Sequence, residues 1–359
     1  MRAPGLRSIT LLLIPAFLLA TESPGRAQTT GGLRGTVCDE AGLPLEGATV
    51  TVSSAAQSVA ARVTATDSEG RFQIQSLPPA GDYQVSALYP GFGPVTLTGL
   101  EVLSGQATLV RIALQRQSQA YQEHVSVKAS PPMVTLQETT GQSRFTSEFI
   151  DSLPILGRNY QDLLALAPGV SDVDGDGNPN IHGARDTDVV TLVDGVSTTD
   201  PLTGKIGAQL NIESIQEIEV KTSGATAEFS RAQGGFANII TKSGGNDFEG
   251  TFKVFYRGSV LDGDGAGIDD PKLHAGLGEN GLRNLTFNDI LPFLSLGGPI
   301  VKDKAWFYVA TEYVQIEDPV NALNSAFVAE QKEFRNFAKL TWQAAPNHRL
   351  SLSLNYDPQ

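Results

Sequence analysis

Hydrophobic and polar residues alternate with a period of two through much of this chain, a pattern typical of β-strands with one buried face. In residues 71–87, for example, Phe72 and Ile74 alternate with polar residues. A Pro-Pro-Ala-Gly turn follows, and then Tyr83, Val85 and Ala87 alternate in the same way. Because turn residues interrupt the alternation at short intervals, the pattern predicts a mainly β protein built from short antiparallel strands.

Residues 31–116 are predicted to form a small antiparallel β-sandwich, with turns at 39–42 and 68–70. The segments GTVCDEAGLPLEGATV, DSEGRF, LPPAGDY and YPGF resemble the carboxypeptidase regulatory-like domain. The resemblance implies a transthyretin-like, carbohydrate-binding-like fold. No His-x-x-Glu pair or other zinc-ligand set accompanies these segments, so peptidase activity is not implied. A structural spacer and a sugar-binding module both remain open.

The N-terminal residues 1–27 are predicted to be a signal peptide. Arg2 and Arg7 precede a ten-residue apolar run, LLLIPAFLLA, and Gly25-Arg26-Ala27 supplies small residues for cleavage. A membrane-spanning helix needs about 20 apolar residues, so this run is too short to be an anchor. The protein is therefore expected to be exported.

Residues 134–248 combine short helices with apolar strands. Thr146 is expected to cap a helix that Pro154 ends, and Asn159 to cap a second one. The strand DVVTLV closes at the Asp194-Gly195 turn, and Ile218 and Val220 share one face of a later strand. The blocks LVDGV and SIQEIEVKTSGATAEFSRAQGGFANIITKSG resemble the TonB-dependent receptor plug in order and spacing. One departure is AEFSRAQGG, where many members have Tyr-Gly before the glycine pair.

A linker over residues 117–133 joins these two modules. Within it lies a β-prone stretch that resembles the TonB box, a segment that pairs with the periplasmic protein TonB by adding a strand. Its residues are Glu123, His124, Val125, Ser126, Val127, Lys128 and Ala129. Such pairing needs a free, β-competent backbone rather than particular side chains. The same stretch could instead be the last strand of the sandwich.

Residues 249–359 are predicted to be the first strands of an antiparallel transmembrane β-barrel. Apolar residues that would face lipid alternate with polar residues that would face the lumen. The outward residues are Phe252, Val254, Tyr256, Phe307, Val309, Tyr313, Ala338, Leu340, Trp342, Leu350, Leu352, Leu354 and Tyr356. Long loops at 258–288 and 317–333 alternate with tight turns at 302–303 and 346–347, as in outer-membrane barrels. Five strands cannot close a barrel of the size that transporters use, about 22, so the chain is expected to be a fragment or a truncated product.

An acidic turn in the plug has calcium-ligand spacing. Asp172, Asp174, Asp176 and Asn178 lie at alternate positions around a Gly, as at the start of an EF-hand loop. The twelfth position is Gly183 instead of a bidentate Glu, so a solvated turn is the alternative. No other cofactor is expected.

The formal net charge of −13 argues against nucleic-acid binding. The four histidines are scattered, and neither a nucleophile elbow nor a phosphate loop occurs, so the chain is not expected to be an enzyme. We predict a TonB-dependent receptor of the Gram-negative outer membrane that imports a scarce nutrient, with carbohydrate favoured. Its plug and regulatory-like domain would lie on the periplasmic side, and its partners would be TonB and membrane lipids. A cell-surface binding or adhesion protein without transport is the alternative.

Overall fold

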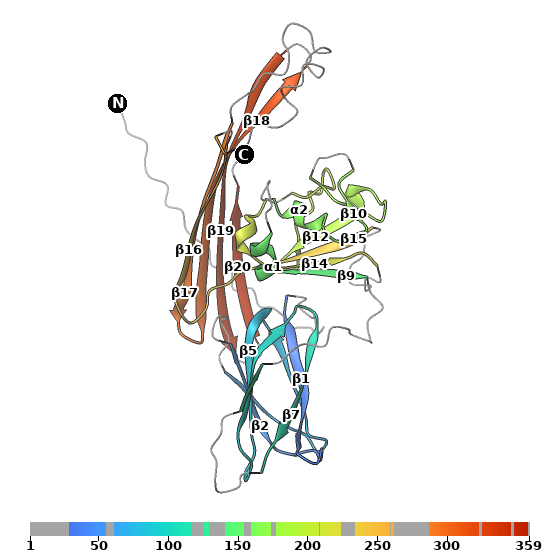
Figure 1. Cartoon of the computed structure of the whole chain (residues 1–359), viewed down its shortest axis with the longest axis vertical. Coiled ribbons are helices and arrows are strands. Elements are labelled where there is room, and N and C mark those ends of the chain that lie inside the picture. The colour runs from blue at the N-terminus through green and yellow to red at the C-terminus, as the bar shows by residue number, and fades with distance from the viewer. Residues whose placement is uncertain are drawn as a thin grey trace, which may run out of the picture.

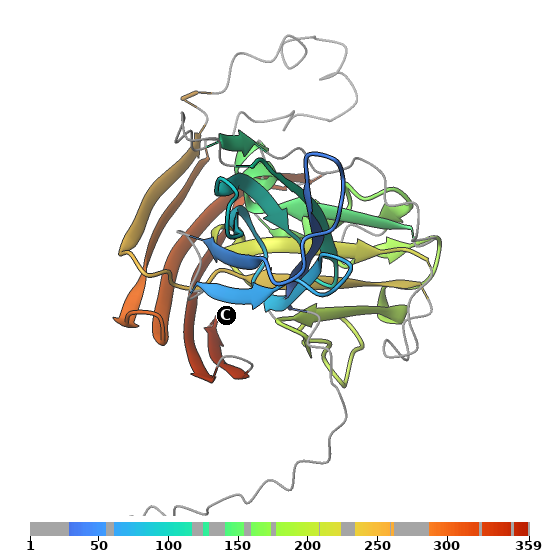
Figure 2. The same ribbon diagram turned by 90° about the horizontal axis from the view of Figure 1, so that it is seen from below.

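The computed structural model describes residues 29–54, 61–116, 125–128, 141–153, 159–173, 177–207, 209–223, 234–258, 260–261, 287–322, 325–345 and 348–357. These residues form a β-sandwich, a compact α+β domain and a curved sheet of long strands (Figure 1). Viewed from below, the α+β domain lies on the concave side of the curved sheet (Figure 2). Within the described residues, no helix has the length and hydrophobicity needed to cross a bilayer.

The sandwich consists of a three-stranded and a five-stranded sheet, with strand orders β4-β1-β7 and β3-β2-β5-β6-β8. The strands are β1 (Gly31–Asp39), β2 (Thr49–Ser54), β3 (Arg62–Ala65), β4 (Arg71–Leu77), β5 (Ala80–Leu88), β6 (Val95–Val102), β7 (Ala107–Leu114) and β8 (Val125–Lys128). Most neighbours are antiparallel, as predicted. Two pairs, β1 with β7 and β6 with β8, are parallel, which the prediction of an antiparallel sandwich missed.

The sandwich core is apolar and follows directly from the alternating pattern. Phe72 and Ile74 from β4 are buried together with Tyr83, Val85 and Ala87 from β5. The Tyr83 hydroxyl donates a hydrogen bond of 2.8 Å to the Pro78 carbonyl, so this buried polar group is satisfied. The prediction for these two strands is therefore confirmed.

The α+β domain is built on a five-stranded sheet with the order β13-β12-β15-β14-β9. Its strands are β9 (Gln142–Thr146), β12 (Val189–Val193), β13 (Val196–Ser197), β14 (Ile215–Lys221) and β15 (Gly235–Thr241), and β10 (Val170–Ser171) pairs separately with β11 (Asn180–Ile181). The helices are α1 (Ser147–Ser152), α2 (Tyr160–Leu164), η1 (Asp186–Asp188) and η2 (Ile212–Ser214).

The helix starts and the hairpin turn predicted for this domain are confirmed. Thr146 and Asn159 occupy the N-cap positions of α1 and α2, although neither side chain makes the capping hydrogen bond. The β12–β13 hairpin turns through Asp194 and Gly195, with φ angles of 49° and 80°. Positive φ at both central residues is the geometry that favours Asp-Gly in a tight hairpin.

The curved sheet is a meander of five antiparallel strands in chain order. They are β16 (Glu249–Gly258), β17 (Asn288–Val301), β18 (Ala305–Ala322), β19 (Ser325–Ala345) and β20 (His348–Tyr356). The predicted outward residues that are most exposed include Phe252 at 71% and Leu352 at 69%, while Trp306 and Phe293 on the opposite face are buried. This apolar outer face is the one expected to meet lipid.

One predicted loop is wrong. Residues 317–322 and 325–333 continue β18 and β19, so that only 323–324 separates the two strands. The hairpin extends well beyond the rest of the sheet (Figure 1). Its polar composition led to the loop prediction, but a paired hairpin satisfies its backbone groups whether or not its side chains are apolar.

Candidate functional site at the plug interfaces

The α+β domain and the concave face of the curved sheet share one hydrophobic core. Phe293, Tyr308, Ala310 and Phe337 from β17, β18 and β19 belong to the same buried cluster as the helices and strands of the α+β domain. The domain therefore packs against the sheet instead of merely lying beside it.

Charged side chains from the sheet reach the α+β domain around this apolar contact. Lys339 of β19 donates hydrogen bonds to Asp194 at 2.9 Å and to the Thr241 hydroxyl at 2.8 Å. Arg335, four residues earlier on the same strand, donates to the Asn159 side chain at 3.0 Å. This bond occupies the oxygen that was expected to cap α2. The interface thus combines a small apolar centre with directional polar contacts.

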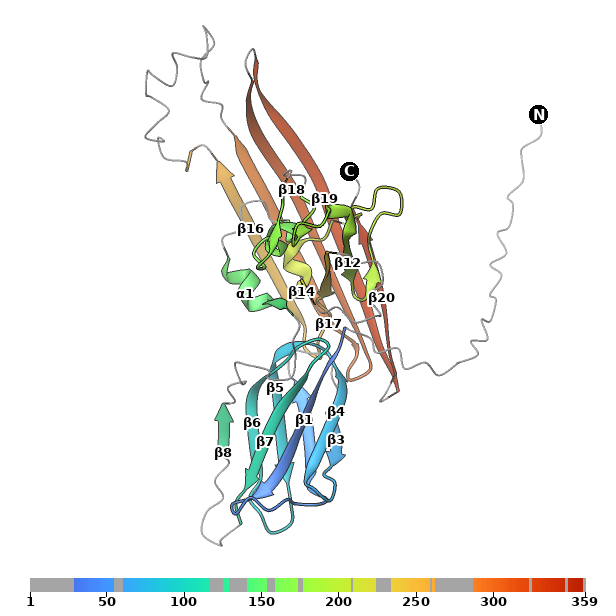
Figure 3. The same cartoon turned by 90° about the vertical axis from the view of Figure 1, so that its right-hand side faces the viewer.

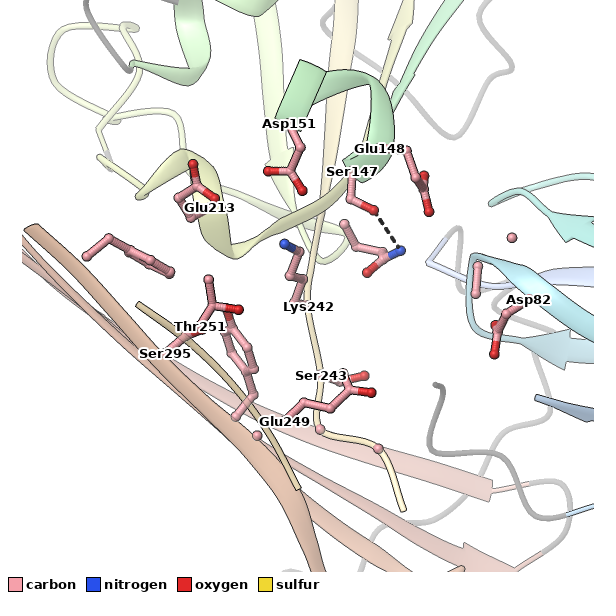
Figure 4. A pocket seen from close by; sticks show the side chains of 18 of the residues that line it. Asp82, Ser147, Glu148, Asp151, Glu213, Lys242, Ser243, Glu249, Thr251 and Ser295 are labelled. Carbon is pink, nitrogen blue, oxygen red and sulfur yellow. Dashed lines mark hydrogen bonds between the residues drawn. The ribbon is translucent and has the colours of Figure 1, made fainter. Parts of the chain in front are cut away.

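A polar cavity of about 440 Å³ lies where the three parts of the molecule meet (Figure 4). Asp82 enters it from the sandwich, Glu148 and Asp151 come from α1, and Glu213 comes from η2. The sheet contributes Glu249, Thr251, Lys253, Phe293, Ser295, Gly297 and Tyr308, and the segment after β15 contributes Lys242, Ser243, Gly244 and Gly245.

Carboxylates outnumber amines in this cavity. Lys253 bridges Asp151, at 2.9 Å, and Glu213, so that β16 is tied to both α1 and η2. Burial lowers the pKa of Lys242, an effect that the nearby Asp151 and Glu148 oppose. The cavity suits polar solutes and water rather than apolar ligands.

A second charged junction joins the sandwich to the α+β domain. Arg144 of β9 bonds Glu217 at 2.6 Å and Glu219 at 2.7 Å, and both carboxylates on β14 have side chains only 2% exposed. Ser104, in the turn after β6, donates from its backbone N–H to Glu217 at 3.2 Å and from its hydroxyl at 3.1 Å. Glu217 thus accepts hydrogen bonds from both domains.

Burial raises the pKa of Glu217, and the neighbouring Arg144 guanidinium acts in the opposite direction. Neither Glu217 nor Glu219 was singled out in the sequence, where they occupy the polar face of an alternating strand. The only sequence signal was the presence of two carboxylates on a strand that otherwise reads as core.

The segment that resembles a TonB box is only partly within the described residues. Val125–Lys128 forms β8, which pairs in parallel with β6 at the edge of the five-stranded sheet, with Val95 opposite Val125 and Thr98 opposite Lys128 (Figure 3). Glu123, His124 and Ala129 lie outside the described residues. Of the two alternatives left by the sequence, pairing with the sandwich is therefore present in the described residues, and pairing with TonB stays a prediction.

Two of the four expected calcium ligands, Asp174 and Asp176, also lie outside the described residues. Asp172 accepts a hydrogen bond from the Gly177 N–H at 2.9 Å, and Asn178 accepts one from the Ile206 N–H at 3.0 Å. In the part of the chain that is described, no three His, Cys, Asp or Glu side chains gather as a metal site would require. Calcium binding stays a prediction.

Family models match both modules. The carboxypeptidase regulatory-like domain matches residues 32–115, and the TonB-dependent receptor plug domain matches residues 135–236. The α+β domain that lies against the curved sheet is thus the plug, and the two matched families are those that the sequence resembles.

Known proteins of the same kind resemble the chain. It is 28% identical over 330 residues to the TonB-dependent transporter Oar of Myxococcus xanthus, a match that covers 82% of this chain and 30% of that protein. Among solved structures, it is similar to the outer membrane transporter YddB from Escherichia coli, with a TM-score of 0.47, 22% identity and coverage of 60% of this chain and 33% of that one. The siderophore receptor PirA from Acinetobacter baumannii is similar with a TM-score of 0.44, 23% identity and coverage of 60% and 31%.

The fold and the matched domains define a chain in which a TonB-dependent receptor plug domain lies against the concave face of the curved sheet. In particular, an N-terminal carboxypeptidase regulatory-like domain precedes this plug, and the chain is similar to a TonB-dependent transporter. It spans 30% of the length of the curated relative that it matches.

Proposed function

We propose that the protein is an outer-membrane transporter that imports a scarce nutrient, with energy supplied through TonB. The observation that carries this proposal is the plug interface, in which Lys253, Arg335 and Lys339 of the barrel strands contact polar groups of the plug. Polar contacts of this kind can be exchanged for water at modest net cost, because water replaces each lost hydrogen bond. An interface held by such polar contacts suits a plug that leaves the barrel strands during transport and docks on them again afterwards.

The remaining features have consistent roles in this proposal. The exposed apolar face of β16–β20 meets lipid, residues 1–27 direct export, and the sandwich lies in the periplasm. The cavity beside Lys242 and Lys253 lies between plug, barrel strands and sandwich, on the side from which a polar solute would leave the barrel. Chemistry on the solute is not part of the proposal, since transport requires only binding and release.

Fractionation of the full-length protein tests the location. The protein should be found in outer membranes, and it should change its mobility in gels on heating, as stable β-barrels do. Recovery as a soluble periplasmic protein would contradict the proposal.

The nutrient can be sought without knowing it in advance. Strains that lack the receptor, lack TonB or lack only residues 123–129 of the receptor should grow poorly on the same limiting nutrient. Carbohydrates are the first class to test, because the N-terminal domain has a carbohydrate-binding-like fold. A binding or adhesion protein without transport would instead leave growth unchanged in all three strains.

A further inference from the structure

The strand β6 and the turn that follows it contact the chain on both sides of the connection between the sandwich and the plug. Along its edge, Val95–Thr98 pairs with Val125–Lys128 of β8. Beyond its C-terminal end, Ser104 is hydrogen-bonded to Glu217, which also holds Arg144 of β9. Because β9 is the next described strand after β8, the chain on both sides of that connection is attached to β6 or to the turn that follows it.

We propose that β6 stores the coupling segment as an edge strand in the resting receptor, and that TonB engages the segment by taking β8 away from β6. This inference rests on the proposed function, since it assigns a regulatory role to the same segment. The N-terminal domain then controls whether the segment is available to TonB.

The energetics favour exchange. Only four residues of β8 pair with β6, and each intramolecular hydrogen bond contributes about 0.5–1.5 kcal/mol net. A partner strand that offers the same number of backbone hydrogen bonds can therefore replace β6 at little net cost. A short edge strand can leave while the strands beside it remain paired.

The path of force also favours exchange over addition of TonB to the outer edge of β8. If β8 stayed paired with β6, force applied to β8 would be transmitted through the sandwich to Ser104. From Ser104 it would reach the plug at Glu217. Once β8 has left, residues 129–141 can span at most about 45 Å, at roughly 3.3–3.6 Å per residue. The pull then reaches β9, which is the edge strand of the plug sheet and carries Arg144.

A reversible cross-link tests the proposal in the full-length receptor. Cys38, the single cysteine of the printed sequence, is first replaced by alanine so that it cannot form a competing disulfide. Thr96 and Ser126 are register partners in β6 and β8, so T96C/S126C should form a disulfide. The probe is the periplasmic domain of TonB, whose affinity is measured with the receptor oxidised and then reduced. Oxidation should weaken binding at least tenfold, and reduction should restore it. The matched control is T51C/S86C, which joins register partners in β2 and β5 and should leave binding unchanged.

The outcomes separate this proposal from the function on which it rests. If deleting residues 123–129 abolishes TonB binding but the oxidised receptor binds normally, TonB adds to β8 in place, and the exchange is wrong. If the deletion itself leaves binding unchanged, the coupling segment lies elsewhere, and the storage proposal is wrong while the transport proposal stands. A second pair, Thr98→Cys with Lys128→Cys, guards against a misfolded first variant. Failure of both pairs to cross-link would also overturn the storage of β8 on β6.

Discussion

The sandwich and the plug differ in what their buried interiors contain. The sandwich core consists of aliphatic and aromatic residues, among them Leu33, Val85 and Ile112, drawn from its own strands. The plug shares its core with the barrel strands and buries Glu213, Glu217 and Glu219. The stability of an apolar core depends only on residues of its own domain. Buried charges are stable only with partners, which here come partly from other parts of the chain. In the proposed transport, the sandwich therefore remains folded while the plug is undocked.

The largest expected effect tests the independence of the sandwich. Val85 is fully buried, so Val85→Asp places an unpaired charge in an apolar core and should unfold this domain completely. The barrel should still assemble, because the sandwich lies outside its core. Limited proteolysis of the full-length receptor would show loss of the N-terminal domain, and unchanged heat modifiability would show an intact barrel. Loss of both together would mean that the two regions fold as one unit.

Removing the cation of the plug junction should have the next largest effect. Arg144→Met leaves Glu217 and Glu219 buried without their partner, which typically costs about 3–5 kcal/mol. The matched control is Arg71→Ala, because Arg71 pairs with Asp67 and Glu69 while its own side chain is 58% exposed. Such an exposed pair, screened by water, contributes little to stability. Urea unfolding of the full-length receptor, followed by protease sensitivity of the plug, compares the two; equal midpoints would contradict the role given to Arg144.

Calcium, if it binds at Asp172, Asp174, Asp176 and Asn178, should stabilise the plug by mass action. At a free concentration ten times the dissociation constant the gain is about 1.4 kcal/mol. Thermal unfolding of the receptor with calcium, and with magnesium as a control, measures it. An unchanged midpoint at millimolar calcium would leave this segment as a solvated turn.

The stability of the folded junction around Glu217 should depend weakly on pH. The pKa of Glu217 is raised from its ordinary value of 4.5, mainly by burial, so the folded protein binds a proton at this carboxyl more readily than the unfolded chain. The contribution of Glu217 to stability is therefore fully present below pH 4.5 and is lost as pH rises through the raised pKa. Arg144 and Ser104 are its direct partners, and Glu219 lies on the same strand.

Hydrogen exchange at the Ser104 amide, which donates to Glu217, reports on this contact directly. After correction for intrinsic exchange, protection in the wild type should increase as the pH is lowered. The Glu217→Gln variant should show a flatter profile. The same slope in both proteins would assign the pH dependence to another group.

Local patterns predicted the strands well, because alternation depends only on neighbouring residues. Phe72, Val85 and Leu352 each lie on the face that the pattern assigned to them. The junctions could not be predicted in this way. Glu217 is 73 residues from Arg144 and 113 from Ser104, so nothing near it in the sequence indicates that it is buried. The length of β18 and β19 was missed for a similar reason, since strand pairing partners decide where a polar hairpin ends.

Displacement of the plug by TonB is the central step of the proposed transport, and the accessibility of a buried plug residue tests it directly. Ser214 is fully buried in η2, near the contact with the barrel strands. In a Cys38→Ala background, Ser214→Cys should react with a membrane-permeant maleimide severalfold faster in cells that have TonB than in cells that lack it. A protonophore should abolish the difference. Equal labelling with and without TonB, in cells that depend on the receptor for growth, would contradict the account.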